Sequence, residues 1–332
     1  MRACAFTHSL SRLLVLLLLF PLASCKPSIT FTGESILDAQ GNEYGLLEWN
    51  VTGKETDEFQ LTGVSIEPDI GPVDPSGAVE VFPTQTTTYT LTAYSVGPNN
   101  IIYNAIHSVT IHIGPRIDYS LIEDANLRAC LQETGFTHVE QFVAIYCLER
   151  DIRRLEGIEQ FTDVQSVSLD YNRVEDLTPL TALPRLNLVS LSSNQLARLD
   201  GLTGSASLRN IVAVNNRIDD VSALAAMPGL ISLALDNNLL FDTVGLESLT
   251  ALQGLSLTRN QIADVAGLAA LTELRALDFS HNPVTAGVPA LNTLTRAVAI
   301  RSEGNGRVRC LDYANLLLAL GPVVIFDQCR LF

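Results

Sequence analysis

The sequence predicts two folded parts: an antiparallel β-sandwich, followed by a solenoid of stacked repeats. Two observations predict this fold class. Between residue 28 and about residue 115, apolar and polar residues alternate in short stretches separated by turn signals, which is the pattern of half-buried strands. From about residue 120 onward, asparagines recur every 22 residues in a regular apolar frame, which indicates stacked units that bury one continuous core.

The composition supports folded domains and argues against a nucleic-acid partner. Hydrophobic residues make up 47% of the 332 residues, which is enough for two packed cores. The net charge is −15, from 36 acidic and 21 basic residues. Because such a chain repels phosphate backbones, we expect it to bind no nucleic acid.

Residues 1–24 are expected to be an export signal. A basic start precedes an apolar run at 13–22, which is too short to span a bilayer because spanning takes roughly 20 apolar residues. The run Leu-Ala-Ser-Cys that ends at Cys25 resembles the bacterial lipobox. The resemblance implies that Cys25 carries the lipid that attaches the protein to the membrane, and that residues 25–27 form the anchored N-terminus. Lys26 then implies the outer membrane, at its periplasmic or its surface side. An ordinary cleaved signal peptide is the alternative.

Four of the six cysteines lie beyond Cys25, namely Cys130, Cys147, Cys310 and Cys329. Export places them in an oxidising compartment, where disulfides form. Four cysteines allow three connectivities. The spacing favours Cys130–Cys147 and Cys310–Cys329, which close two short loops on either side of a long stretch without cysteine.

The first part, residues 28–115, is expected to form the β-sandwich. Period-two alternation runs through 46–51, 86–93 and 108–113, and several short strands at this spacing favour a sandwich. Trp49, the only tryptophan, is expected in its core. The runs Leu-Glu-Trp-Asn-Val and Pro-Thr-Gln-Thr-Thr-Thr-Tyr-Thr-Leu-Thr-Ala resemble bacterial immunoglobulin-like domains. This resemblance implies a spacer on a surface protein.

The second part contains six repeats in register. Their frame is LxxLxLxxNxIxxLxxL, and one unit carries the run Leu-Thr-Pro-Leu-Thr-Ala-Leu at 177–183. The pattern resembles the leucine-rich-repeat family in its 22-residue internalin form. The resemblance implies a parallel sheet on the concave face, an irregular or 3-10 convex side, and helical caps. The repeated asparagines are expected to be structural, because their amides can pair backbone groups of adjacent turns. They are Asn172, Asn194, Asn216, Asn238, Asn260 and Asn282.

Both ends of a solenoid expose its core and need caps. Residues 120–164 are expected to hold the N-terminal cap, which begins with a helix, and an atypical first repeat. Arg150 takes the asparagine position of that repeat. Regular repeats are expected at 164–304. Residues 305–332 are expected to form the C-terminal cap, with a second helix.

Outward residues of the sheet are the candidate binding residues, because leucine-rich-repeat proteins bind through this face. The face is small and polar, with Tyr171 as its single aromatic. Tyr171 and Arg259 are its only residues of the types that dominate binding hot spots. One alternative is a solvated face without a partner. Another is recognition by the basic C-terminal cap, with Arg296, Arg301, Arg307, Arg309 and Arg330. The candidate binding residues are Asp170, Tyr171, Asn215, Asp236, Asn237, Arg259, Asp278 and His281.

These features predict a monomeric, lipid-anchored binding module of the cell envelope, with an unidentified protein or glycan partner. The alternative is a structural envelope component without a specific ligand. The sequence has no nucleophile elbow, HExxH, P-loop or dinucleotide-binding motif,. We therefore expect no catalytic residues, no metal and no cofactor, and an enzyme is the least favoured class. The segment 38–43 lacks the alternating ligands of a calcium loop and is expected to be a plain turn.

Overall fold

The computed structural model describes four stretches of the chain, namely residues 27–52, 60–97, 100–327 and 329. The expected export signal, Cys25, Lys26 and Arg330 lie outside the described residues. No helix within the described stretches is both long enough and apolar enough to cross a membrane.

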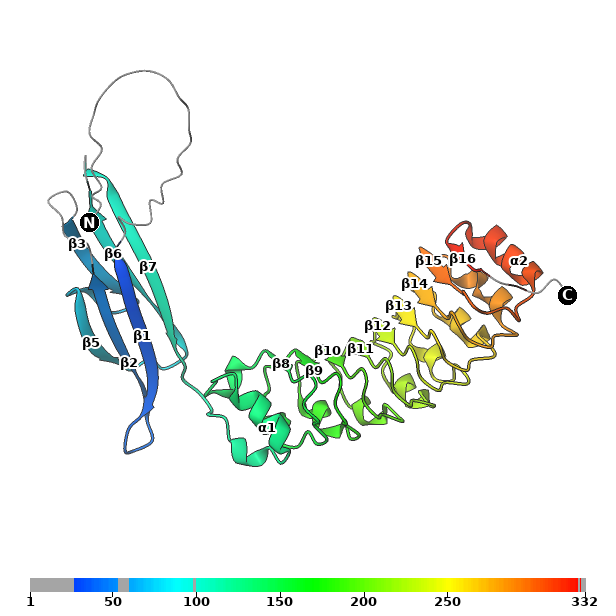
Figure 1. Ribbon diagram of the computed structural model, residues 1–332, viewed down its shortest axis with the longest axis horizontal. Coiled ribbons are helices and arrows are strands. Elements are labelled where there is room, and N and C mark those ends of the chain that lie inside the picture. The colour runs from blue at the N-terminus through cyan, green and yellow to red at the C-terminus, as the bar shows by residue number, and fades with distance from the viewer. Residues whose placement is uncertain (1–26, 53–59, 98–99, 328, 330–332) are drawn as a thin grey trace, which may run out of the picture. The chain divides into compact units, whose positions relative to one another are not determined.

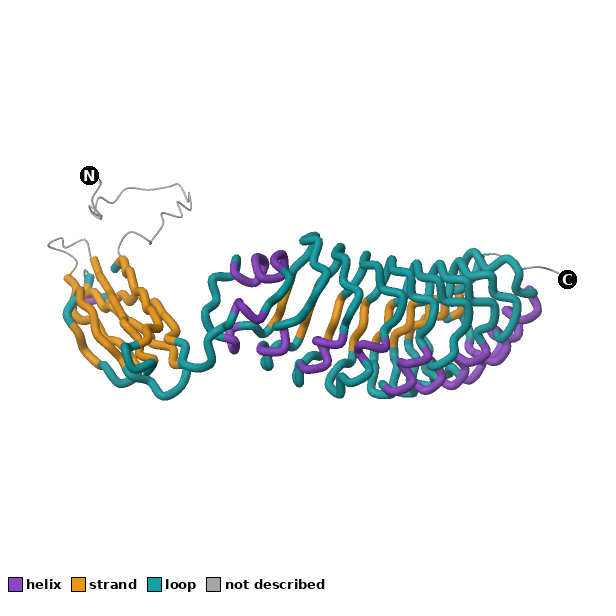
Figure 2. Tube along the Cα trace, turned by 90° about the horizontal axis from the view of Figure 1, so that it is seen from below, coloured by secondary structure: helices purple, strands orange, loops and turns teal. Residues whose placement is uncertain are grey.

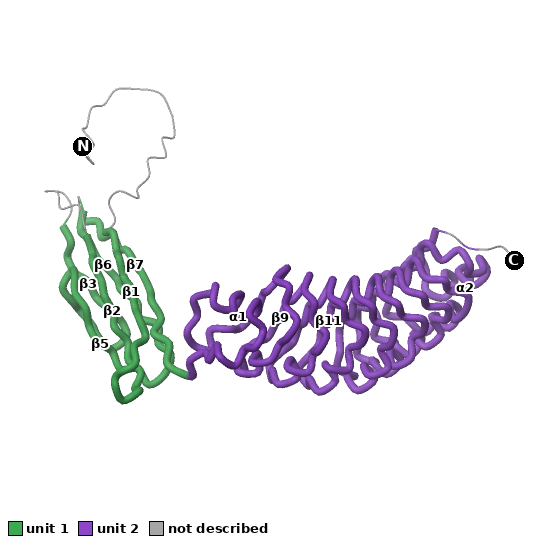
Figure 3. Tube along the Cα trace, turned by 60° about the horizontal axis from the view of Figure 1, so that its bottom comes forward, with its two compact units in different colours: residues 1–114 green, residues 115–332 purple. Residues whose placement is uncertain are grey.

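The first compact unit, Met1–Gly114, contains two antiparallel sheets (Figures 1 and 3). One sheet has the strand order β1-β2-β5, and the other has the order β4-β3-β6-β7. The strands are β1 (Ser28–Leu37), β2 (Glu43–Thr52), β3 (Gln60–Glu67), β4 (Gly71–Val73), β5 (Ser76–Val81), β6 (Thr87–Val96) and β7 (Ile102–Ile111).

Both sheets of this unit contribute to one core. Successive side chains of a strand point to opposite faces, so Leu47 and Trp49 of β2 are buried while the residues beside them are more exposed. Trp49 is 8% exposed, as predicted, and its indole N–H donates to the carbonyl oxygen of Asp74 at 2.8 Å. Ile66 and Leu91 of the second sheet are fully buried in the same cluster. Trp49 thus belongs to a single core to which both sheets contribute side chains.

The second compact unit, Pro115–Phe332, is a solenoid with one parallel nine-stranded sheet. In Figure 1 its strands follow one another along the concave side of the unit, from green to red. They run in chain order from β8 to β16. The strands are β8 (Ala144–Tyr146), β9 (Ser166–Ser168), β10 (Leu188–Ser190), β11 (Asn210–Val212), β12 (Ser232–Ala234), β13 (Gly254–Ser256), β14 (Ala276–Asp278), β15 (Ala299–Arg301) and β16 (Val324–Ile325).

Short 3-10 helices form the return path of the chain. Figure 2 shows them stacked along a side of the solenoid away from the strands, which agrees with the predicted convex side. All but the first, Tyr119–Leu121, bury one or two apolar residues, such as Leu180 and Leu268. These helices are Tyr119–Leu121, Val139–Gln141, Ile158–Gln160, Thr178–Ala182, Asp200–Leu202, Ser222–Ala226, Leu246–Ser248, Ala266–Ala270 and Val288–Thr293.

The repeat period sets the register of the sheet. Val167 faces Val189, and Val189 faces Ile211, so equivalent residues of successive repeats pair directly. Between β14 and β15 the offset grows by one residue, because Leu277 faces Ile300. The central residue of each three-residue strand points into the core, as the alternation of strand side chains requires,.

The repeated asparagines are buried at the turns that follow the strands. Asn216 is typical. Its Oδ1 accepts from the N–H of Leu196 at 3.1 Å, and its Nδ2 donates to the carbonyl oxygen of Leu191 at 2.9 Å. Both partners belong to the preceding repeat, and each of the other five asparagines makes the equivalent pair of bonds. We call this row the asparagine ladder. It satisfies buried backbone groups that the turns leave without other partners.

The ladder continues one turn further than the sequence analysis predicted. Asn305 is 1% exposed, accepts from the N–H of Asn282 at 2.7 Å and donates to the carbonyl oxygen of Phe279 at 3.0 Å. It lies 23 residues after Asn282, so one extra residue hides it from a search at constant spacing. The segment expected to be only a C-terminal cap therefore begins with a ladder position.

A helix and a disulfide close each end of the solenoid. Helix α1 (Ala125–Gln132) is tied to the first strand region by Cys130–Cys147, with the Cα atoms 5.9 Å apart. Helix α2 (Cys310–Leu320) is tied down by Cys310–Cys329, with the Cα atoms 5.0 Å apart. These are the two pairs that the spacing favours. The last residues also add β16 to the sheet beside β15, which the sequence analysis did not predict.

Asp124 locks the first helix to the first turn of the solenoid. Its carboxylate accepts from the N–H groups of Asn126 and Leu127 at the start of α1, and from those of Arg153 and Arg154 in the first turn. Burial raises the pKa of Asp124, but the four N–H donors outweigh burial, and the net effect lowers the pKa from its ordinary value of 3.8. The N-cap residue of α1 thus also joins this helix to the first turn of the solenoid through hydrogen bonds.

Candidate functional site

Five of the eight candidate binding residues occupy the same position in successive repeats, directly before the ladder asparagine. Their backbones are left-handed, with φ between 56° and 59°. The N–H of each donates to a carbonyl of the next repeat, as Tyr171 does to Ser192 at 2.8 Å. Their side chains therefore emerge where each strand passes into its turn. The five are Tyr171, Asn215, Asn237, Arg259 and His281.

Three of these five side chains are in contact with neighbouring repeats. The Asn237 amide donates to Oδ1 of Asn215 at 2.5 Å. The His281 ring lies against the backbone of Gly304, because a Cβ at Gly304 would stand 2.2 Å from its Nδ1. Tyr171, 59% exposed, and Arg259, also exposed, project into solvent. They are the members of the row most open to a partner.

Two of the candidate carboxylates hold the stack together. Asp170 accepts from the hydroxyl of Ser190 at 2.7 Å and from the N–H of Ser192 at 2.6 Å. Asp236 accepts in the same way from Ser256 and from the N–H of Thr258, at 2.5 and 2.8 Å. Each carboxylate thus joins its own repeat to the next. We conclude that their first role is structural, although both remain partly exposed.

The third carboxylate, Asp278, lies at the end of β14 beside a shallow depression of about 420 Å³ over β12–β15. Small side chains make its floor, and Arg301 of β15 faces Asp278 directly in the sheet register. No ion pair within the described ranges involves Arg301. The depression is thus lined mostly by small side chains, and its two charged residues, Asp278 and Arg301, lie next to each other. Its lining includes Ala234, Gly254, Ser256, Ala276, Asp278 and Arg301.

The opposite end of the sheet carries an exposed cluster of large apolar residues on β8–β10 and the turns that follow them. We call Tyr146, Leu148, Tyr171 and Leu188 the aromatic patch. Their exposed fractions are 67%, 46%, 59% and 37%. The prediction of a single aromatic on this face was wrong, because Tyr146 adds a second. Its position directly before Cys147, in the atypical first repeat, was the signal that could have revealed it.

The described residues bring together no cluster of candidate metal ligands. No group of three or more His, Cys, Asp or Glu side chains in those ranges could hold a metal ion. The 38–43 segment is a turn in which Asp38 accepts from the N–H groups of Gln40 and Asn42 and from the Asn42 amide. The Asn42 side chain is the main cause of a lowered pKa of Asp38. The Asp38 carboxylate thus accepts hydrogen bonds within its own turn, as a plain turn would have it.

The basic residues near the C-terminal cap do not form one free patch. Arg309 forms a bidentate ion pair with Asp312 on α2, and Arg296 pairs with Glu273. Arg330 lies outside the described residues, and Arg301 belongs to the sheet face. Within the described residues, two of the five arginines of this alternative, Arg296 and Arg309, are therefore paired with carboxylates.

Comparisons with known proteins bear on the fold. No protein-family model and no curated protein sequence matches the chain. Among solved structures, internalin C2 of Listeria monocytogenes is 24% identical, over 65% of this chain and 99% of its own, with a TM-score of 0.55. Another Listeria monocytogenes internalin is 25% identical, over 57% of this chain and 53% of its own, with a TM-score of 0.48. A Leptospira interrogans leucine-rich-repeat protein is 15% identical, over 53% and 57%, with a TM-score of 0.39.

The likeness to internalin C2, together with the nine-stranded parallel sheet, shows that the chain contains a leucine-rich-repeat fold. The match with the second Listeria monocytogenes internalin spans only about half of that protein's length, 53%. At these identities the likeness concerns fold alone, and it assigns no partner.

Proposed function

We propose that the chain is a recognition module of the bacterial cell envelope, which binds a protein partner through the face of its parallel sheet. The aromatic patch carries this proposal. Two tyrosines and two leucines are held exposed on a sheet whose backbone is fixed by the asparagine ladder. Clusters of exposed apolar side chains mark interaction sites, and tyrosine is enriched among the residues that dominate binding energy.

The chemistry of the patch favours a protein over a glycan. Leu148 and Leu188 offer only aliphatic surface, which pairs with apolar side chains and not with hydroxyl groups. Fully burying an exposed leucine contributes about 1.5–3 kcal/mol. Because Leu148 and Leu188 are already partly covered and association has its own cost, the patch supplies only a part of the about 8 kcal/mol of a micromolar affinity. Arg259 and the Asp278–Arg301 end of the face would add polar contacts and orientation.

The anchor and the first unit complete this proposal. We infer that Cys25 carries a lipid, that the mature protein resides at the outer membrane, and that the two-sheet unit is an immunoglobulin-like spacer. The lipobox-like run and the shared core of the two sheets support this inference. Cys25→Ser should abolish membrane attachment, with the protein recovered in the soluble fraction or as an unprocessed precursor. Retention of the variant in membranes washed with high salt would contradict the lipid anchor.

The test of recognition uses the full chain as bait with envelope extracts and with host-cell extracts. Wild type is compared with Tyr146→Ala combined with Tyr171→Ala, and captured proteins are identified by mass spectrometry. The matched control is Phe241→Ala, because Phe241 is also exposed, at 61%, but lies in the turn after the ladder asparagine of its repeat and not on the strand face.

We expect a specific partner that wild type and the Phe241 variant retain equally, and that the double tyrosine variant loses by at least about tenfold, or 1.4 kcal/mol. Unfolding midpoints of all three proteins check that the bait is folded. A partner retained by the double variant, or lost with the control, would refute recognition through the aromatic patch.

A further inference from the structure

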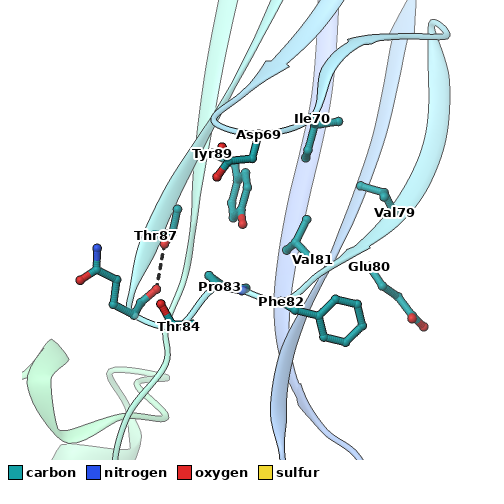
Figure 4. Close-up of a pocket in the computed structure, with 11 residues that line it drawn as sticks. Asp69, Ile70, Val79, Glu80, Val81, Phe82, Pro83, Thr84, Thr87 and Tyr89 are labelled. Atoms are coloured by element: carbon teal, nitrogen blue, oxygen red, sulfur yellow. Dashed lines mark hydrogen bonds between the residues drawn. The ribbon is translucent and has the colours of Figure 1, made fainter.

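The first unit contains a cleft that has no role in the proposed function. It has a volume of about 640 Å³ and opens between two chain segments (Figure 4). One is the end of β5 with the loop after it, and the other is Asp69–Ile70 together with the start of β6. Ile70, Val81 and Pro83 give the walls an apolar part, beside polar residues such as Thr84 and Thr87. Sites that take small ligands or inserted side chains have volumes in this range.

Tyr89 of β6 forms the inner wall of the cleft. It is only 4% exposed, yet no hydrogen bond from the described part of the chain reaches its hydroxyl. Figure 4 shows this hydroxyl pointing into the cleft. Burial, and after it the charge of Asp69, raises the pKa of Tyr89 above 10.0, so the group is a neutral donor at physiological pH. The hydroxyl itself still reaches the solvent of the cleft, so it is available to donate a hydrogen bond to a ligand there.

Two carboxylates stand at the rim of the cleft. Asp69 and Glu80 both line it, and neither forms an ion pair with any residue in the described ranges. Phe82, 70% exposed, adds an aromatic surface on the Glu80 side of the cleft (Figure 4) and stacks on Tyr44 with the ring centroids 5.7 Å apart. The rim is therefore acidic and aromatic, which suits a cationic group.

Strand β5 offers a free backbone edge next to the cleft. Among the described strands, it pairs with β2 alone. The N–H of Val51 donates to the carbonyl of Pro75 at 2.8 Å, and antiparallel pairs alternate between bonded and non-bonded positions. The register Trp49↔Gly77 then directs the backbone groups of Ala78 and Glu80 away from β2, toward the open edge.

The facing edge of the other sheet is closed to the same kind of pairing. β4 has three residues, and its central residue is Pro72, which has no N–H,. Prolines and short strands are the usual protection of a sheet edge. β5 has six residues and no proline, so it is the edge of this opening that remains available.

We propose that β5 and the cleft form a second binding site, which takes an extended basic segment of a partner protein as an added strand. The segment bonds to the outward N–H and C=O groups of Ala78 and Glu80. An apolar side chain of the segment enters the cleft, and the Tyr89 hydroxyl donates to one of its carbonyl oxygens. Cationic side chains on either side face Asp69 and Glu80. Strand addition of this kind takes its affinity from main-chain bonds and its specificity from side-chain pockets.

The test uses a fluorescein-labelled ten-residue peptide of alternating valine and lysine, with binding to the full chain followed by fluorescence anisotropy. Two comparison peptides isolate the contributions. One replaces lysine by glutamate, and the other keeps lysine but carries N-methyl groups on alternate backbone nitrogens. We expect each comparison peptide to bind at least about tenfold more weakly.

Protein variants separate strand addition from simple attraction to an acidic chain. Ala78→Pro removes one outward N–H and keeps every charge, and it should weaken binding at least about tenfold. Tyr89→Phe removes only the hydroxyl and should weaken binding about threefold or more. Tyr171→Ala, a change in the second unit, should leave binding unaltered. Trp49 fluorescence reports whether the first unit of each variant is folded.

The proposal fails if no binding of the valine–lysine peptide is found at about millimolar concentration. It also fails if the N-methylated peptide binds as well as the parent, or if Ala78→Pro and Tyr89→Phe together have no effect. Displacement of the peptide by n-butylamine alone would instead identify a site for small cations, and would overturn the added strand.

Discussion

Replacing Asn216 by alanine should destabilise the solenoid by an amount that the hydrogen bonds of this residue determine. Its Nδ2 donates to the carbonyl oxygens of Leu191 and Val214, but those oxygens also accept from other donors, Asn194 and Ser193. Only the buried N–H of Leu196 loses its acceptor. One unsatisfied buried donor costs about 1–3 kcal/mol, which is the expected loss in the free energy of unfolding.

The assay is urea denaturation followed by two signals. Far-UV circular dichroism reports both units, whereas the only tryptophan, Trp49, belongs to the first unit. The circular dichroism transition should move to lower urea, and the tryptophan transition should not move. Asn210→Ala is the control, because it removes an exposed bond to Asn187 and should change stability by less than about 0.5 kcal/mol. A loss below about 0.5 kcal/mol for Asn216→Ala, or equal shifts of both signals, would refute the reasoning.

Three further predictions concern the caps and the turns. Asp124→Ala should lower stability by about 1–2 kcal/mol at pH 7. Because the folded pKa of Asp124 lies below 3.8, its stabilisation is present above that pH and is lost as the pH falls through the folded value, so urea midpoints of variant and wild type should converge in acid. Changing Cys310 and Cys329 together to serine should cost about 3 kcal/mol, measured as a lower midpoint of thermal unfolding. Gly287→Ala should cost about 1–3 kcal/mol in urea denaturation, because φ is 89° and a Cβ would lie 2.2 Å from a backbone nitrogen. Gly254→Ala should be nearly neutral in the same measurement, because its Cβ would make only an ordinary van der Waals contact with the Ser232 hydroxyl, at 3.6 Å.

The solenoid was predictable because the same set of buried backbone groups needs hydrogen-bond partners in each of its turns. A buried asparagine must pair the same backbone groups in every repeat, so the asparagines from Asn172 to Asn282 recur at constant spacing. This spacing predicts the parallel sheet that the structure contains. The departures from prediction occur where the period breaks. Asn305 follows an inserted residue, and Tyr146 precedes a cysteine in place of the usual leucine. Periodicity therefore predicts the middle of a repeat array better than its ends.

The candidate sites were only partly predictable. Sequence alone placed Asp170 and Asp236 among the outward residues, but not their bonds to the next repeat, because such bonds depend on side-chain rotamers across the stack. The cleft beside β5 left no pattern in the sequence. It lies between segments of two different sheets, and only the pairing of the strands shows that β4 and β5, although consecutive in the chain, are edges of separate sheets. The lipid anchor, the envelope location and the immunoglobulin-like character of the first unit remain predictions.

The two disulfide-bonded caps have a consequence for how the solenoid opens. A linear stack without such caps frays from its ends, where each unit has a single neighbour. Here both ends are pinned, by Cys130–Cys147 and Cys310–Cys329, so the earliest local opening should begin in the interior. The turn around Ser205 is the natural starting point, because this hydroxyl is buried without a hydrogen-bonding partner among the described residues. Amide hydrogen exchange should therefore be faster near Ser205 than at either end helix, an inversion of the usual gradient of protection along a repeat protein.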